Sequence, residues 1–429
     1  MDSINFKIVL INHSFQINYF SRRWQIFAQQ HPNVDVTLLA PIKYEWYAGK
    51  TYSYGKSTIM EGKEKDEGNF HTKLFRIVKR KYFGWRSPDF KNLFLTIKPD
   101  IIYHIGTHNQ DSLKQSIEIV RKYLPRTKVI AFSMRGPAFN LKIKKDRCNL
   151  IKWVGRRFFY MYQKTHLAYI NRYCEAFFCH YPDAVDCFRE EGYMGPIYMQ
   201  TQVGVNTEWF HPDKVSRQEI RNKYGLGDAY VFGSATRFSL SKGLDDIIYA
   251  LPLKGNWKYL MMGAGSEEDT MRIKNLIKER GLNDKIILTG FVDWYDMAKY
   301  WNAIDCALHT PRTTERWEET FSLSIAQAMV TGKPVIGSNS GSVPYQVGPE
   351  GLIVAEGDIQ AIHDKIEWVM SHKKAAQDIG KKMQYRAENC FSVQHLNDMF
   401  YETILDIIQG KYDTTKIDMV NYTPKCYVS

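Results

Sequence analysis

Two cations in the second half of the chain lie in a loop that could hold phosphate. A strand-like run, Tyr230–Ala235, is followed by Arg237, then by Lys242 five residues later, and then by a helical pattern. A helix N-terminus offers backbone N–H groups and the positive end of its dipole to an anion, and the two cations would add direct charge. The arrangement could hold a diphosphate, but loop cations are usually solvated, and these two residues alone do not favour binding over solvation.

Glycines and carboxylates follow further along the same half. Gly263 and Gly265 lie between a strand-like run and a helical pattern, which indicates either a tight connection or a close backbone approach to a ligand. Glu319 precedes a helix predicted to begin near Ser322, where the helix dipole stabilises a negative charge by about 0.3–1 kcal/mol. Gln327 lies among apolar residues, and a buried amide needs partners, for which ligand hydroxyls are candidates.

Alternating strand and helix patterns must position these residues. At 429 residues the chain is longer than one hydrophobic core normally serves. The alternation predicts α/β architecture with parallel sheets covered on both faces. Strand signals pause at residues 204–212, so we expect two doubly wound Rossmann-like domains, 1–205 and 206–392, and a C-terminal helix and tail, 393–429, that crosses back to the N-terminal domain. Ligands of such folds bind at the carboxyl ends of the strands, so a cleft between the two domains is the expected site.

Each expected strand is a short, mainly apolar run of strand length. They are residues 7–11, 34–40, 100–105, 129–134, 176–181, 198–203, 230–235, 258–262, 285–289, 306–309, 334–337 and 351–354. Helical patterns are clearest at residues 110–123, 267–280, 359–370 and 391–410.

Composition and charge exclude some classes of protein. The longest apolar runs are far shorter than the roughly 18 residues that a membrane span needs. The first residues lack a basic region and a small-residue cleavage site, so we expect a cytoplasmic protein. None of the seven cysteines forms the C-x-x-C spacing of a zinc site. The net charge of +12 attracts polyanions but does not distinguish nucleic acid, anionic lipid and phosphorylated substrates.

The order of these motifs resembles family 4 of the glycosyltransferases, which are retaining enzymes of the GT-B fold. The resemblance covers about residues 200–375. It rests on Arg237 and Lys242, Gly263 to Gly265, Gly290-Phe291, Glu319, Ala328-Met329, Gly332-Lys-Pro-Val335, Ser338 and Gly341-Ser342. The N-terminal half is similar more loosely, through Pro99-Asp-Ile-Ile102 and the linker Gly204-Val-Asn206.

The resemblance implies a role for each matching residue. Arg237 and Lys242 would neutralise the donor's diphosphate, and Glu319 would accept hydrogen bonds from the transferred sugar. Val292 would lie beside the base. Backbone N–H groups near the phosphates would come from Phe321, Ser322 and Leu323. The sequence has no Asp-x-Asp motif, so neither a metal nor another cofactor is expected.

Three positions depart from the family's pattern. Gln327 replaces a Glu that binds ribose hydroxyls, and we expect binding to survive with a weaker, uncharged contact. The first loop lacks the family's glycines, so His13, Ser14 or Asn18 would take over contacts to the donor. Arg135 stands where the family commonly has a His facing the donor sugar's C6 group. Because Arg suits bidentate binding of carboxylates, a uronic acid is a candidate donor sugar; bracing the cleft or binding phosphate are the alternatives.

The acceptor side is indicated by two basic, aromatic segments, residues 73–86 and 142–162. Such segments suit single-stranded nucleic acid or an anionic membrane surface, and a solvated helix face is the simplest alternative. With the resemblance, a lipid-linked acceptor at the inner face of the membrane is the better functional interpretation, and nucleic acid is not expected as a partner.

The resemblance therefore implies a retaining glycosyltransferase. It would move a sugar from a nucleoside-diphosphate sugar to a hydroxyl of a glycan or lipid-linked glycan in cell-surface polysaccharide synthesis. The alternative is a catalytically inert GT-B protein that binds nucleotides or glycans, motivated by Gln327 and Arg135.

Overall fold

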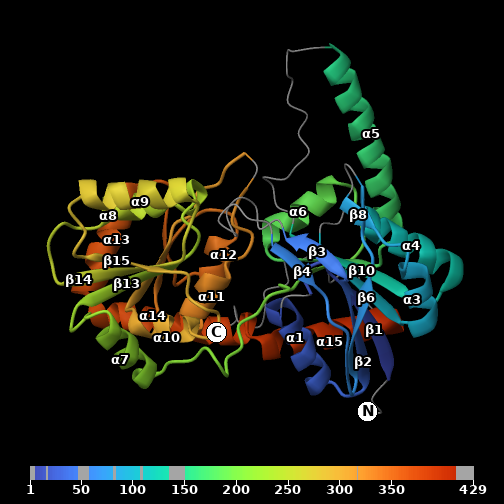
Figure 1. Cartoon of the computed structure of the whole chain (residues 1–429), viewed down its shortest axis with the longest axis horizontal. Helices are drawn as coiled ribbons and strands as arrows, with labels where there is room; N and C mark the ends of the chain where they lie inside the picture. Colours follow the sequence, from blue (N-terminus) through green and yellow to red (C-terminus); the bar gives the residue numbers. More distant parts are fainter. Residues whose placement is uncertain are drawn as a thin grey trace. The chain divides into compact units, whose positions relative to one another are not determined.

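The computed structural model describes residues 5–15, 18–46, 58–80, 84–106, 110–134, 150–315 and 317–411. These residues form two compact units, each with its own sheet (Figure 1). Unit 1 is formed within Met1–Trp46, Ile59–Gln202 and Asn397–Thr423, and unit 2 is formed mainly by Val203–Leu396.

Unit 1 is built on an eight-stranded sheet in the order β12-β11-β10-β9-β1-β2-β6-β5. All neighbouring strands are parallel except β5 and β6, which are antiparallel. The strands are β1 Phe6–Ile11, β2 Val34–Pro41, β5 Lys65–Glu67, β6 Phe70–Phe75, β9 Ile101–Gly106, β10 Lys128–Ser133, β11 Ala176–Cys179 and β12 Ile197–Met199. Two further pairs, β3 Lys43–Trp46 with β4 Thr58–Glu61 and β7 Val78–Arg80 with β8 Gly84–Arg86, lie outside this sheet.

The described helices of unit 1 are α1 Asn18–Gln30, α3 Phe90–Ile97, α4 Asp111–Tyr123, α5 Leu150–Tyr173 and α6 Pro182–Glu190. The last of the described helices, α15 Val393–Gln409, contributes most of its length to this unit. Its Phe400 is fully buried, with its ring centroid 5.2 Å from that of Trp24 and 5.1 Å from that of Tyr103. The Arg23 side chain donates to Asn397 Oδ1 over 3.0 Å. A C-terminal segment therefore completes the core of the first unit.

Unit 2 contains a six-stranded, fully parallel sheet in the order β15-β14-β13-β16-β17-β18. Its strands are β13 Tyr230–Ala235, β14 Trp257–Met262, β15 Ile286–Gly290, β16 Cys306–His309, β17 Val335–Ser338 and β18 Leu352–Val354. Its helices are α7 Lys214–Lys223, the 3₁₀ turn η2 Leu240–Lys242, α8 Leu244–Ala250, α9 Glu267–Glu279, α10 Met297–Ala303, α11 Leu323–Val330, α12 Val343–Val347, α13 Ile359–Ser371 and α14 Lys373–Cys390.

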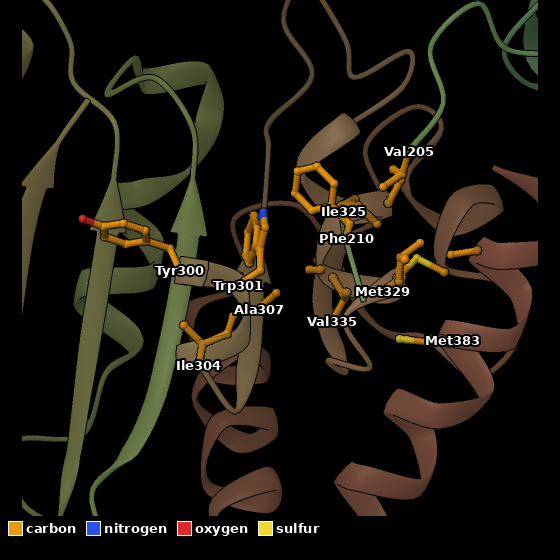
Figure 2. Packing of buried hydrophobic residues seen from close by; sticks show 14 of the residues in the cluster. Val205, Phe210, Tyr300, Trp301, Ile304, Ala307, Ile325, Met329, Val335 and Met383 are labelled. Carbon is orange, nitrogen blue, oxygen red and sulfur yellow. The ribbon is translucent and has the colours of Figure 1, made fainter. Parts of the chain in front are cut away.

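Two hydrophobic clusters cover the two faces of this sheet. Successive side chains of a strand point to opposite faces, so Val231 of β13 joins one cluster and Phe232 joins the other. The first cluster receives α10, α11 and α14, and the second receives α8, α9 and α13 (Figure 1). Figure 2 shows part of the first cluster, with Trp301 of α10, Met329 of α11 and Met383 of α14. The near-continuous apolar character of these strands follows from burial on both faces.

The predicted α/β class and the parallel sheets are confirmed, whereas several local predictions are wrong. The run predicted at residues 198–203 ends at Met199. The basic segment 73–86 is not a helix face, because its described residues belong to β6 and the β7–β8 hairpin. Of the segment 142–162, residues 142–149 lie outside the described residues and the rest begins α5. Among the described helices, none combines the length and apolar character that crossing a membrane requires.

Candidate functional site

The loops after three neighbouring strands of unit 2 are joined by backbone hydrogen bonds. Thr236 N–H donates to Met262 O over 3.0 Å, Phe238 N–H donates to Ala264 O over 3.1 Å, and Gly263 N–H donates to Gly290 O over 2.8 Å. Because parallel strands end at the same edge, the loops after β13, β14 and β15 form one continuous surface there. Arg237 is a partly buried residue of the first of these loops.

The two predicted glycines of the second loop are required by close packing. Gly263 has φ of +131°, and a Cβ atom there would lie 2.1 Å from Thr236 O. At Gly265 a Cβ atom would lie 2.9 Å from the Cβ atoms of Phe238 and Asp269. Both glycines therefore allow the loops after β13 and β14 to approach each other, which accounts for them without a ligand.

An ion pair joins two of the predicted site residues. Lys242 Nζ, at the end of η2, lies 2.6 Å from Glu319 Oε2, and both side chains are about nine-tenths buried. His309, the last residue of β16, places Nε2 3.1 Å from the same oxygen. The ring of Trp317 lies 4.3 Å from Lys242 Nζ, in cation–π geometry. The structure therefore brings Lys242 and Glu319 together, with His309 and Trp317 as additional neighbours.

The backbone of Glu319 is fixed by the loop after β17. Ser342 N–H donates to Glu319 O over 2.7 Å. Gly341 has φ of +46°, and a Cβ atom there would lie 2.2 Å from Glu319 O. Only glycine permits this approach, so the small-residue turn Gly341-Ser342 positions the carboxylate.

The start of α11 offers fewer free N–H groups than the sequence indicated. Ser322 is the N-cap residue, and its Oγ accepts from Ile325 N–H. The Gln346 side chain binds both backbone groups of Ser322, with its Oε1 3.0 Å from the Ser322 nitrogen and its Nε2 2.6 Å from the Ser322 oxygen. The N–H of Ser322 is therefore already bonded within the fold. Leu323 begins the helix, and the first N–H groups of a helix have no intrahelical acceptor.

Gln327 lies in the core between α10 and α11. Its side chain is 3% exposed, and Trp301 Nε1–H donates to its Oε1 over 3.0 Å (Figure 2 labels Trp301). Among the described residues, Gln327 Nε2 has no hydrogen-bond partner. The Gln327 amide is thus bonded to an indole N–H of the protein, a partner that the sequence did not indicate.

The loop after β15 contains two apolar residues, of which Val292 is buried and Phe291 is exposed. Val292 is 8% exposed and packs in the first cluster, so contact with a base would have to come from its backbone. Phe291 is 78% exposed, which is unusual for so large an apolar side chain.

Charge strongly favours the ionised form of Glu319. Burial alone would raise its pKa, but the Lys242 charge and the hydrogen bond from His309 outweigh burial and lower the pKa from 4.5 to about 2. Burial lowers the pKa of His309, against the opposing effect of the Glu319 carboxylate. At neutral pH the group is therefore a carboxylate between an ammonium and a neutral imidazole.

The depressed pKa predicts how stability depends on pH. A carboxyl whose pKa is lower in the folded state stabilises the fold above pH 4.5, and that contribution is lost as the pH falls towards 2. We expect wild type to lose about 2 kcal/mol relative to Glu319→Gln between pH 7 and pH 3. Urea unfolding of both proteins at pH 7, 4.5 and 3 measures the difference. An unfolding free-energy difference that stays constant with pH would contradict the buried ion pair.

Another residue predicted to contact the donor, His13, belongs to unit 1. His13 follows β1 and is partly buried, and burial lowers its pKa to about 4. Its neighbour His104, in β9, has a pKa lowered by burial and by His13, and its Nε2 lies 2.9 Å from Ser112 Oγ. Arg135 lies outside the described residues. The described residues contain no group of His, Cys, Asp and Glu side chains that could hold a metal ion.

Sequence reasoning missed His309 because it was assigned to a strand. A polar residue at the carboxyl end of a parallel strand was an available signal, since ligands bind at that edge. Trp317 carried no such signal, because its contact with Lys242 depends on the path of the loop after β16.

The fold is that of the GT-B class of proteins. Sucrose-phosphate synthase from Thermosynechococcus elongatus aligns with a TM-score of 0.68 at 16% identity, covering 95% of this chain and all of that one. An identity this low supports the likeness of fold alone.

Sequence comparison finds a family model that matches most of unit 2. Residues 216–386 match the family model described as glycosyl transferases group 1. The GDP-mannose-dependent alpha-(1-6)-phosphatidylinositol monomannoside mannosyltransferase of Mycobacterium tuberculosis is 27% identical over 185 residues, 41% of this chain and 48% of that protein. The capsular polysaccharide biosynthesis glycosyltransferase CapM of Staphylococcus aureus is 28% identical over 217 residues, 48% of this chain and 55% of that protein. The chain thus spans about half the length of these relatives.

Proposed function

We propose that the protein is a retaining glycosyltransferase of family 4. It would transfer a sugar from a nucleoside-diphosphate sugar to a hydroxyl of a glycan or lipid-linked glycan in cell-surface polysaccharide synthesis. The observation that carries this proposal is the buried Lys242–Glu319 pair, within the region that matches the glycosyltransferase family model. Relatives whose names describe mannosyl transfer to a phosphatidylinositol glycan and capsular polysaccharide synthesis support the same class.

The site residues have complementary roles in this proposal. Departure of a nucleoside diphosphate develops negative charge, and fixed cations stabilise it; Lys242 and Arg237 would do so. Glu319 Oε1 would accept hydrogen bonds from the sugar, because Lys242 and His309 both approach the other oxygen, Oε2. The N–H of Leu323 remains a candidate for phosphate, whereas that of Ser322 is bonded to Gln346. Because protein cations serve the leaving group, the proposal includes no metal and no cofactor.

Several finer features stay predictions. A uronic acid as the transferred sugar depends on Arg135, which lies outside the described residues. Contact of His13 with the donor and association with an anionic membrane surface at the cytoplasmic face also stay predictions.

A catalytically inert nucleotide-binding protein is the second candidate. It is favoured by Gln327, whose Oε1 is bonded inside the core to Trp301. Sugar transfer by the purified protein separates the two candidates, since only the first predicts turnover.

Nucleotide binding provides the first test. We expect one of UDP, GDP, dTDP and CMP to raise the melting temperature by several degrees, because a ligand at about a hundred times its Kd adds roughly 2.7 kcal/mol to stability. Thermal denaturation with each nucleotide measures this shift, with Lys254→Ala as an exposed-lysine control that keeps it. A nucleotide that raises the melting temperature identifies the donors to use in a turnover assay, which include uronic acids and neutral hexoses. Arg135→Lys is the variant expected to lose a preference for the uronic acid. No shift with any of the four nucleotides would contradict the proposed function.

A further inference from the structure

The environment of Glu319 contains a second donor besides Lys242, and it comes from a rigid element. His309 is 7% exposed and ends β16, where its backbone pairs with Gly337 of β17. Its Nε2 lies 3.1 Å from Glu319 Oε2, the oxygen that Lys242 Nζ also contacts. Glu319 Oε2 is therefore contacted both by the long, flexible side chain of Lys242 and by the short side chain of His309, which a strand holds in place.

The proton on the histidine follows from its partner. An ionised carboxylate can only accept hydrogen bonds, so the contact requires a proton on Nε2 of His309. Among the described residues, two charged groups face this ring, Glu319 from the segment before α11 and Lys242 from η2. Burial lowers the pKa of the imidazole below its usual range. His309 is thus a neutral donor with a fixed tautomer near pH 7.

The two donors differ in what a ligand can change. Lys242 carries charge on four rotatable bonds, and a diphosphate competes with Glu319 for its ammonium group. His309 has no charge to offer a phosphate and has a side chain with only two rotatable bonds on a paired strand. If a diphosphate drew Lys242 away, His309 would still be within hydrogen-bond distance of Glu319 Oε2.

We propose that His309 is a positioning residue, which holds Glu319 so that Oε1 faces the transferred sugar while Lys242 serves the diphosphate. The inference rests on the proposed function of this site and adds a residue to which no role has been assigned. Charge comes from Lys242 and orientation comes from His309. A misplaced contact group lowers the rate more than the affinity, since orientation is needed most in the transition state.

The test compares His309→Ala and His309→Gln with wild type, using whichever of GDP-mannose and UDP-glucose wild type turns over. The Nε2 amide of glutamine can donate near the position of the imidazole Nε2–H, whereas alanine cannot. We expect His309→Ala to lower kcat about tenfold, the cost of roughly one hydrogen bond, with donor KM changed less than about threefold. His309→Gln is expected to recover at least about a third of wild-type kcat. His363→Gln is the matched control, because His363 contacts Ala250 O outside the site.

Binding of the sugar part gives a second readout that needs no turnover. Calorimetry measures how much tighter the nucleotide sugar binds than the bare nucleoside diphosphate, and we expect His309→Ala to reduce this ratio about two- to threefold while leaving the Kd of the diphosphate unchanged. Two results would overturn the positioning role alone. One is a His309→Ala protein with wild-type kcat and a wild-type binding ratio, and the other is an equal loss of kcat in the alanine and glutamine variants. Failure of wild type to bind any nucleoside diphosphate would overturn the proposed function, and this role with it.

Discussion

Lys242→Ala is expected to lower sugar transfer by about 10²–10³-fold, since removing one group that stabilises developing charge typically has this effect. The same change leaves Glu319 buried without its cation, and breaking a buried ion pair typically costs about 3–5 kcal/mol. We expect the loss to be about 3 kcal/mol, because His309 still donates to the carboxylate. Steady-state kinetics with the identified donor and urea unfolding at pH 7 measure the two effects.

Two comparisons make the Lys242 result specific. Lys254→Ala removes an exposed lysine of the same unit and should keep both activity and stability. Lys242→Ala combined with Glu319→Gln should be more stable than Lys242→Ala alone, because no unpaired charge is then buried. A stable, fully active Lys242→Ala protein would contradict the assigned role of the pair.

Glu319→Ala is expected to abolish most transfer, by about 10² or more, without weakening the binding of the bare nucleoside diphosphate. The reason is that Glu319 would contact the sugar, and its removal frees the Lys242 ammonium for phosphate. Calorimetry with UDP or GDP and kinetics with the corresponding sugar donor separate the two outcomes.

Controls for this variant follow from its chemistry. Glu319→Gln keeps one acceptor oxygen and should retain more activity than Glu319→Ala, and Glu279→Ala removes an exposed carboxylate at the end of α9. If Glu319→Ala weakened diphosphate binding as much as Lys242→Ala, the carboxylate would be acting through the fold and not through the sugar.

Much of the fold was readable in the sequence because it depends on local patterns. The runs at residues 230–235 and 306–309 match β13 and β16 residue for residue, since strands buried on both faces are short and continuously apolar. Helices with an apolar stripe, such as α9 and α13, were equally clear. Strands β4, β5, β7 and β8 were missed because they are short and mostly lie outside the main sheet. Strand β6 was missed because polar residues interrupt its apolar pattern.

The candidate site was only partly readable for a different reason. Residue types and spacing singled out Lys242 and Glu319, because the chemistry of phosphate and hydroxyl binding limits which residues can serve. No local sequence pattern could show that Lys242 and His309 both contact one oxygen of Glu319. Nor could a local pattern show that the Gln346 side chain bonds the backbone of Ser322, or that Trp301 bonds the Gln327 amide. These contacts join residues far apart in the chain, and only the packing of parallel strands and their loops decides which side chains meet. The sequence by itself thus determined the class of fold and the kinds of chemical group, and the tertiary structure decided their pairing, because hydrogen bonds depend on distances that chain order does not set.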